Sequence, residues 1–168
     1  TIYVSMKLTK PAEQAFEQVL KQAPGWPNTR IKLCQQKIIL NKLEEASALL
    51  SEEIKRFGYD LNVSFTQGLL HRANKNYAEA LPEFEKFRQQ NPERHDYWEL
   101  SIECMQNLQD RDGLKNLHIE ARNTEDAKDR EWLQTLIVNN LAELDSSRTP
   151  KHQTLEQYLQ QDPENEIM

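Results

Sequence analysis

Similar residues recur every 34 positions along this chain of 168 residues, and a repeat of that length restricts the possible folds more than any other feature of the sequence. The clearest copy runs from Gly68 to Pro92. Within it Ala80, Phe84 and Phe87 are spaced by four and three residues, which places them on one face of a helix. A tight turn is expected at residues 74–76, and the proline ends the second helix because it cannot continue one. This stretch predicts a helical hairpin.

The same pattern can be followed backward and forward from this copy. Shifted by 34 residues, alanine falls on alanine, large apolar residues fall on one another, and proline or glycine closes each copy. The matched positions are Ala12, Ala46 and Ala80; Phe16, Leu50 and Phe84; Leu43 and Tyr77; Cys34 and Gly68; Pro24, Gly58 and Pro92; and Trp98 and Trp132. The pattern weakens after Trp98, since Leu114 and His118 replace the alanine and the aromatic.

In its period and in these residues the chain resembles the tetratricopeptide repeat family over about residues 10–145. The resemblance implies an all-α fold in which antiparallel helix-pair repeats of 34 residues stack as a right-handed superhelical solenoid. It divides the chain into a half repeat (1–26), repeats at 27–60, 61–94 and 95–128, the first helix of a further repeat (129–145), a linker (146–151), and a terminal helix with a tail (152–168). Within the half repeat a helix is expected to begin at Pro11, and Gly58 is expected to end its helix in the left-handed conformation.

In tetratricopeptide arrays the first helix of each pair lines a concave groove that binds other proteins. The positions that match this groove are Asn28, Ile31 and Gln35; Asn62, Phe65, Leu69 and Arg72; Asp96, Glu99 and Glu103; and Arg130, Leu133 and Ile137. By resemblance they are the expected partner-binding residues. Where some family members hold a C-terminal carboxylate, this chain has Ile31, Gln35, Thr66, Asp96 and Leu100. Those side chains cannot form such a clamp, so capture of a C-terminal carboxylate is not expected.

The helix expected at residues 61–73 allows two interpretations. Its apolar line, Leu61, Phe65 and Leu69, is displaced by about one residue from the expected phase, where polar Ser64 and Gln67 stand. In the first interpretation Phe65 and Leu69 face the groove, and exposed apolar area framed by polar groups marks an interaction site. In the second the helix has slipped locally and both residues belong to the core.

The charge distribution limits the classes of partner. The net charge of −6 and the pI near 5.3 disfavour nucleic acid, because phosphate binding needs clustered Lys and Arg. No apolar run approaches the ~18 residues of a membrane span, so membrane insertion is not expected. Asp96, Glu99 and Glu103 form one helical stripe within residues 95–128, which hold eight acids and four bases. The stripe is either a solvated helix face or lines the groove, where it would favour a partner that carries Lys or Arg beside apolar anchors.

Motifs for catalysis or metal binding are not found. Cys34 and Cys104 fall in repeats that are not adjacent, so both are expected to be reduced core residues. The four histidines do not cluster, and the sequence has neither Cys-x-x-Cys nor His-Glu-x-x-His, so neither a metal nor a cofactor is expected. The acidic pairs at 44–45 and 52–53 are expected on solvated helix faces.

The leading hypothesis is a non-catalytic protein–protein interaction scaffold that binds a partner peptide or amphipathic helix in its groove. The alternative is a structural or oligomerisation module of a larger protein, in which apolar residues make self-contacts and the chain forms a homo-oligomer. The chain begins at Thr1 without an initiator methionine, which leaves a larger parent open. A cytoplasmic location is expected, since no signal peptide is recognisable.

Overall fold

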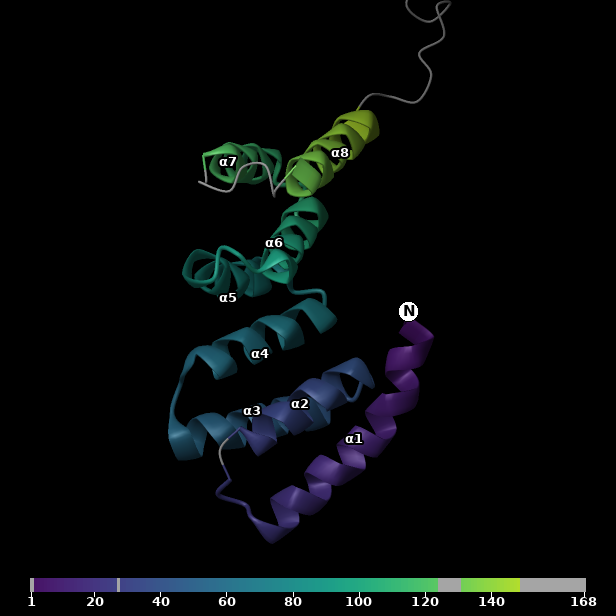
Figure 1. Ribbon diagram of the computed structural model, residues 1–168, viewed down its shortest axis with the longest axis vertical. Helices are drawn as coiled ribbons and strands as arrows, with labels where there is room; N and C mark the ends of the chain where they lie inside the picture. Colours follow the sequence, from purple (N-terminus) through teal and green to yellow (C-terminus); the bar gives the residue numbers. More distant parts are fainter. Residues whose placement is uncertain (1, 27, 124–130, 149–168) are drawn as a thin grey trace, which may run out of the picture. The chain divides into compact units, whose positions relative to one another are not determined.

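In a computed structural model of the protein, every regular element among the described residues is an α-helix (Figure 1). The structure describes residues 2–26, 28–123 and 131–148, with side chains for 10–26, 28–123 and 131–146. The helices are α1 (Ile2–Gln22), α2 (Thr29–Ile39), α3 (Leu43–Phe57), α4 (Leu61–Ala73), α5 (Tyr77–Gln90), α6 (His95–Asn107), α7 (Arg111–Arg122) and α8 (Glu131–Arg148). The expected all-α class is thereby confirmed for this part of the chain.

The chain forms two compact units, Thr1–Leu108 (unit 1) and Gln109–Met168 (unit 2). In unit 1, α1 packs against α2, and α2 also packs against α3 and α4. Helix α4 contacts α3 and α5 as well, and α5 packs against α6. In unit 2, α7 packs against α8. Helices α2 and α4 are therefore each surrounded by three others, which leaves little of their surface free.

The turns between paired helices repeat with the period of the sequence. Helices α3, α5 and α7 begin at Leu43, Tyr77 and Arg111, and each is preceded by a non-glycine residue with positive φ: Asn41 (58°), Lys75 (62°) and Gln109 (56°). After α2 the N–H of Lys42 donates to the carbonyl of Lys37 at 2.8 Å, and after α4 the N–H of Asn76 donates to that of His71 at 2.8 Å. These six-residue closures are Schellman motifs, which satisfy the last carbonyls of each helix. The tight turn expected at residues 74–76 is confirmed.

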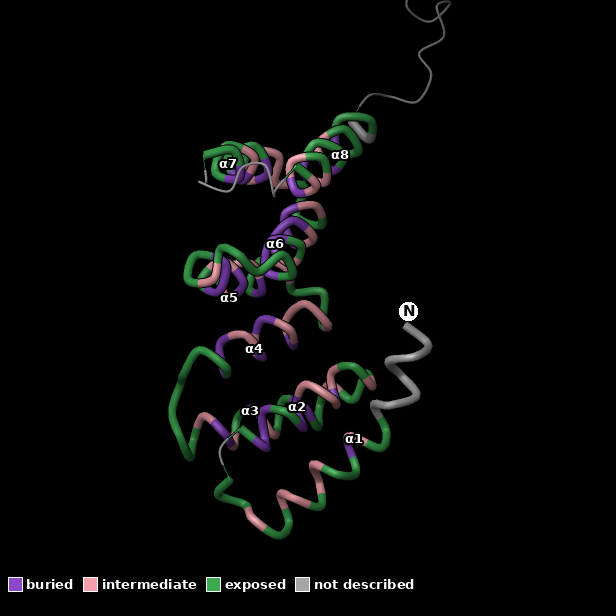
Figure 2. The backbone as a smooth tube through the Cα atoms, viewed as in Figure 1, coloured by how far each residue is buried: buried purple, intermediate pink, exposed green. Residues whose placement is uncertain are grey.

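The matched apolar positions occupy equivalent places in the packing. Ala46, Ala80 and Leu114, which lie 34 residues apart, are all fully buried. Phe84 is fully buried too, and its ring lies so close to Gly68 that a Cβ atom there would be 2.9 Å from Cε1. Ala12 in α1 is only half-buried. Helix α1 packs mainly against α2, whereas α2 and α4 each have three neighbouring helices (Figure 2).

Three boundaries differ from those expected. Helix α1 does not begin at Pro11 but runs through it from Ile2; a proline inside a helix removes one backbone hydrogen bond, and the helix continues here despite that loss. Gly58 has φ 85° and ψ −170°, a conformation open to glycine but not the left-handed helical one. Helix α8 continues to Arg148, into the expected linker. The remainder of that linker and the expected terminal helix lie outside the described residues.

Candidate functional site

The first helices of successive pairs, α2, α4 and α6, carry most of the expected partner-binding positions, and side-chain contacts join these helices. Asn62 Nδ2 donates to Asn28 Oδ1 at 3.5 Å. Gln35 Nε2 donates to Thr66 Oγ1 at 3.0 Å. These contacts define a surface named here the α2–α4–α6 face, which comprises Asn28, Gln35, Asn62, Arg72, Asp96, Glu99 and Glu103, with Thr66 buried beneath it.

An ion pair joins α4 to α6 within this face. Arg72 Nε donates to Glu103 Oε1 at 2.9 Å, and Nη2 lies 2.7 Å from Oε2. This two-point geometry is the strongest arrangement of an arginine and a carboxylate. The hydrogen bond that Arg72 donates to Glu103 raises the pKa of the Arg72 guanidinium above its ordinary value. The pair therefore holds the middle of the face in one arrangement.

The acidic stripe on α6 is accessible to solvent. Asp96 and Glu99 are exposed and Glu103 is half-buried. Arg94 pairs with Asp96 at 2.7 Å, and the hydrogen bond from this guanidinium lowers the pKa of the Asp96 carboxyl. Glu99 is the member of the stripe most open to water, since Asp96 and Glu103 pair with Arg94 and Arg72.

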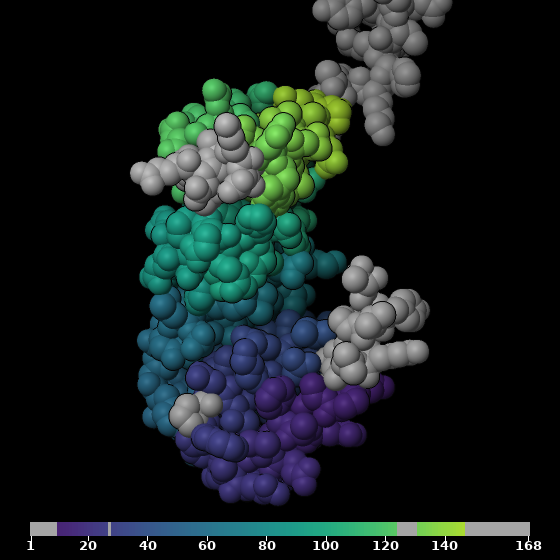
Figure 3. Space-filling model, viewed as in Figure 1, coloured from purple at the N-terminus to yellow at the C-terminus, as the bar shows by residue number. Residues whose placement is uncertain are grey.

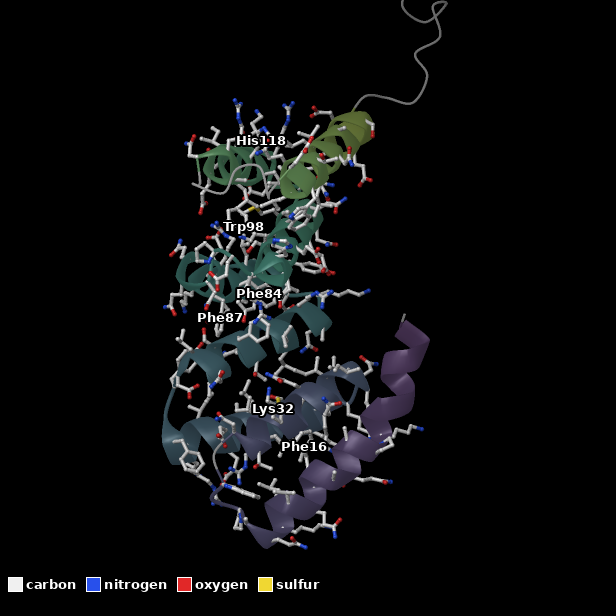
Figure 4. All side chains as sticks on the ribbon, in the orientation of Figure 1. Phe16, Lys32, Phe84, Phe87, Trp98 and His118 are labelled. Atoms are coloured by element: carbon white, nitrogen blue, oxygen red, sulfur yellow. The ribbon has the colours of Figure 1, made fainter. Side chains whose placement is uncertain are left out.

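Phe65 and Leu69 pack against the core of unit 1, which favours the second of the two interpretations. The Phe65 ring lies 4.9 Å from the Phe87 ring, 5.4 Å from that of Tyr97 and 6.0 Å from that of Phe84, measured between centroids. Phe84 and Phe87 project from α5 toward the interior (Figure 4). Both Phe65 and Leu69 are half-buried and pack on the cluster of Ala80, Phe84 and Cys104. The main role of Phe65 and Leu69 is therefore to pack against the core of unit 1.

Three of the expected partner-binding residues are buried, so the prediction that they line an accessible groove is wrong. Ile31 is almost fully buried, because α2 has α1, α3 and α4 around it. Leu133 and Ile137 are fully buried in unit 2, where their spacing of four residues places both on the buried side of α8. Arg130 lies outside the described residues.

Two buried ionic groups were not expected from the sequence. Arg30 on α2 pairs with Glu53 on α3 at 2.9 Å, and both side chains are less than a tenth exposed. Lys37 on α2 contacts Glu13, Glu17 and Glu45 at 2.8, 2.8 and 2.7 Å. The sequence predicts Glu53 on a solvated face, since helical periodicity does not reveal a charged partner on another helix.

Cys34 and Cys104 are free and buried, as expected. Burial raises the pKa of each thiol to about 12, so neither is a thiolate at neutral pH. Across residues 2–26, 28–123 and 131–148, no group of three or more His, Cys, Asp or Glu residues is placed to hold a metal ion.

Two pockets lie away from the α2–α4–α6 face. One of about 480 Å³ is lined by α3 residues, Leu43, Glu44, Ser47, Ala48 and Ser51, and by Asn74. The other, of about 380 Å³, is lined by Ala23, Gly25 and Trp26 in the connection between α1 and α2. Neither contains a residue of the α2–α4–α6 face.

In comparisons with known proteins, no family model, no curated protein and no solved structure matches this chain. Helices long and apolar enough to cross a membrane are also absent from the described part of the chain. The function must therefore be argued from the chain's own residues.

Proposed function

We propose that the protein is a non-catalytic scaffold of the tetratricopeptide type, stacked as a solenoid, which binds a peptide or helix of another protein on its α2–α4–α6 face. The observation that carries this proposal is the set of polar contacts that link one first helix to the next. Asn28 contacts Asn62 at the start of α4, and Arg72 contacts Glu103 near its end, so polar contacts link α4 to both of the neighbouring first helices. The 34-residue recurrence of the positive-φ turns supports the repeat architecture.

The chemistry of the face suits an extended segment. Exposed amides at Asn28 and Asn62 can both donate and accept hydrogen bonds, which suits the backbone of a bound peptide. The exposed carboxylates of Asp96 and Glu99 favour a partner that carries Lys or Arg, mainly through the rate and orientation of association. Phe65 and Leu69 support this surface from beneath.

Site-specific photo-crosslinking tests the proposal. A photoreactive phenylalanine analogue is placed at Asn62 or Glu99 and, as a control, at Ser47 on α3, which is exposed but lies off the face. We expect a defined protein adduct from positions 62 and 99 and none from position 47, with circular dichroism unchanged in all variants. Equal adducts from all three positions, or none from the face, would contradict the proposal.

A second candidate function is an oligomerisation module, and exposed aromatic residues favour it. Trp26 and Phe57 are 62% and 56% exposed, Tyr59 in the connection between α3 and α4 is 52% exposed, and Leu61 at the start of α4 is 45% exposed. Sedimentation at several concentrations separates the two functions, since a scaffold stays monomeric. A dimer that is lost in a Trp26→Ser/Phe57→Ser variant would support self-association.

A further inference from the structure

Helix α1 is attached to unit 1 in a different way from the helices that follow it. Among its described side chains, residues 10–22, only Glu13 is buried. Its apolar residues, Ala12, Phe16, Val19 and Leu20, are half-buried. Figure 2 shows α1 mostly as exposed and intermediate backbone where it is described. By contrast, α2 to α7 each bury three or more side chains.

An ionic cluster holds α1 in place, and it is named here the α1 latch: Glu13, Glu17, Lys37, Lys42 and Glu45. Lys37 on α2 is its centre, since its ammonium contacts all three carboxylates. Lys42, in the connection to α3, also donates to Glu13 at 2.6 Å. The carboxylates of Glu13 and Glu17 are four residues apart, so one turn of α1 supplies two of the three carboxylates that contact Lys37.

One hydrophobic cluster of unit 1 is formed without residues from α1. The cluster shared by α2, α3 and α4 consists of Ile31, Cys34, Ala46, Leu50, Val63 and Leu70, and none of these residues comes from α1. The outer members of the latch are open to water, since the side chains of Glu17, Lys42 and Glu45 are 41%, 42% and 57% exposed. Exposed ion pairs are weakened by salt and can be replaced by other ions. Among the contacts described for α1, these outer ion pairs are therefore the easiest to break.

We propose that α1 is a detachable helix, and that the surface beneath it, formed by α2 with Lys37 and Lys42, is a second binding site for an acidic amphipathic helix of another protein. The partner carries the pattern that α1 itself shows: carboxylates at the positions of Glu13 and Glu17, and apolar residues at those of Phe16 and Leu20. Figure 4 places Phe16 between α1 and α2, and Figure 3 shows the purple atoms of α1 lying against the blue atoms of α2 and α3. Helix α1 then acts as an internal competitor of that partner.

The surface that α1 covers is suited to this partner by charge as well as by shape. Lys37 is buried, and of its three carboxylates only Glu45 belongs to α3, so a helix that replaced α1 without a carboxylate would leave the ammonium with one partner in place of three, which is unfavourable. Specificity for an acidic helix follows from this penalty. The site is separate from the α2–α4–α6 face, so its test does not depend on the proposed function.

Peptide binding to the full chain tests the proposal. The probe is a fluorescent peptide of residues 10–23, and the proteins are wild type, Glu13→Gln/Glu17→Gln, and Glu44→Gln, which removes an exposed carboxylate outside the latch. We expect the double variant to bind the probe at least about tenfold more tightly than wild type or Glu44→Gln do, because its own α1 competes less. A probe with both glutamates changed to glutamine should bind more weakly. Equal affinity of all proteins, or no binding to the double variant, would overturn the proposal.

Hydrogen exchange gives a second test that does not need the double variant to fold. In wild type at about 1 M salt, where screening acts within ~3 Å, and in the milder Glu17→Gln variant, the α1 amides should exchange roughly tenfold faster while those of α2 to α5 keep their protection. Protection of α1 equal to that of α2 under both conditions would show that α1 is a fixed part of the fold and would also overturn the proposal.

Discussion

At the scale of single residues, Gly68 shows how closely two helices can approach. A Cβ atom at this position would lie 2.9 Å from Phe84 Cε1 and 3.1 Å from the Cβ of Glu83. We expect Gly68→Ala to lower the free energy of unfolding of unit 1 by about 1–3 kcal/mol, because α4 and α5 must separate or the Phe84 ring must move. Gly25→Ala is the control, since no atom lies within 4 Å of a Cβ there. Denaturant unfolding of both variants measures the difference, and equal stability would contradict the close approach.

The buried pair of Arg30 and Glu53 gives a second prediction at this scale. Arg30 also donates to the carbonyl of Pro24 at 3.3 Å, so it ties the connection before α2 to α3. Arg30→Met should destabilise unit 1 by about 3–5 kcal/mol, because it leaves a buried carboxylate without its cation. The double variant Arg30→Met/Glu53→Leu should recover most of that loss. Arg56→Met, which removes an exposed pair with Glu52, is the control and should have a much smaller effect. If the double variant were as unstable as Arg30→Met, the pair would contribute more to stability than the neutralisation of the Glu53 charge.

The 34-residue period predicts the burial of residues that recur along the chain. It does not predict the burial of residues that have no equivalent in the other repeats. Ala46, Ala80 and Leu114 are buried at equal spacing, because helices stacked with one period place equivalent side chains alike. Lys37 and Glu53 are charged residues in buried places, and their partners lie on other helices, where no local pattern points to them. Phe65 could not be assigned to core or groove until Phe87 and Tyr97 were seen beside it.

At the scale of helices, the positive-φ residues that end α2 and α4 carry strain that glycine would remove. Lys75 has φ 62°, in the left-handed region that costs a residue with a side chain about 1–2 kcal/mol. We expect Lys75→Gly to raise the free energy of unfolding by roughly 0.5–1 kcal/mol, after the greater chain entropy of glycine is subtracted. Lys86→Gly, within α5, should lower it by about 1 kcal/mol. Thermal melts compare the two, and a destabilised Lys75→Gly would mean that its Schellman turn is not strained.

The attachment of α1 should depend on pH in a known direction. The hydrogen bonds from Lys37 and Lys42 lower the pKa of Glu13 below its ordinary value of 4.5. A lowered folded-state pKa contributes stability that is present above the ordinary pKa and is lost as the pH falls through the lowered value. The α1 amides should therefore keep constant protection from pH 7 to about 5 and lose it at lower pH, as the pH falls through the lowered pKa of Glu13. In Glu13→Gln the loss of α1 amide protection at low pH should be smaller. An unchanged loss would show that other carboxylates cause it.

At the scale of the whole molecule, the local character of the contacts predicts local responses to mutation. In repeat-like helical proteins each helix pair depends mainly on its neighbours, and this chain forms two compact units. Leu117 on α7 is almost fully buried, and Ile119 on the same helix is 56% exposed. We expect Leu117→Ala to cost about 2–5 kcal/mol and to remove the hydrogen-exchange protection of α7 and α8, while α2 to α5 remain protected. Leu50→Ala in α3 should do the reverse, and Ile119→Ala should change neither unit. If Leu117→Ala instead lowered protection equally from α2 to α8, the chain would unfold as one cooperative body, and the division into two units would carry no energetic meaning.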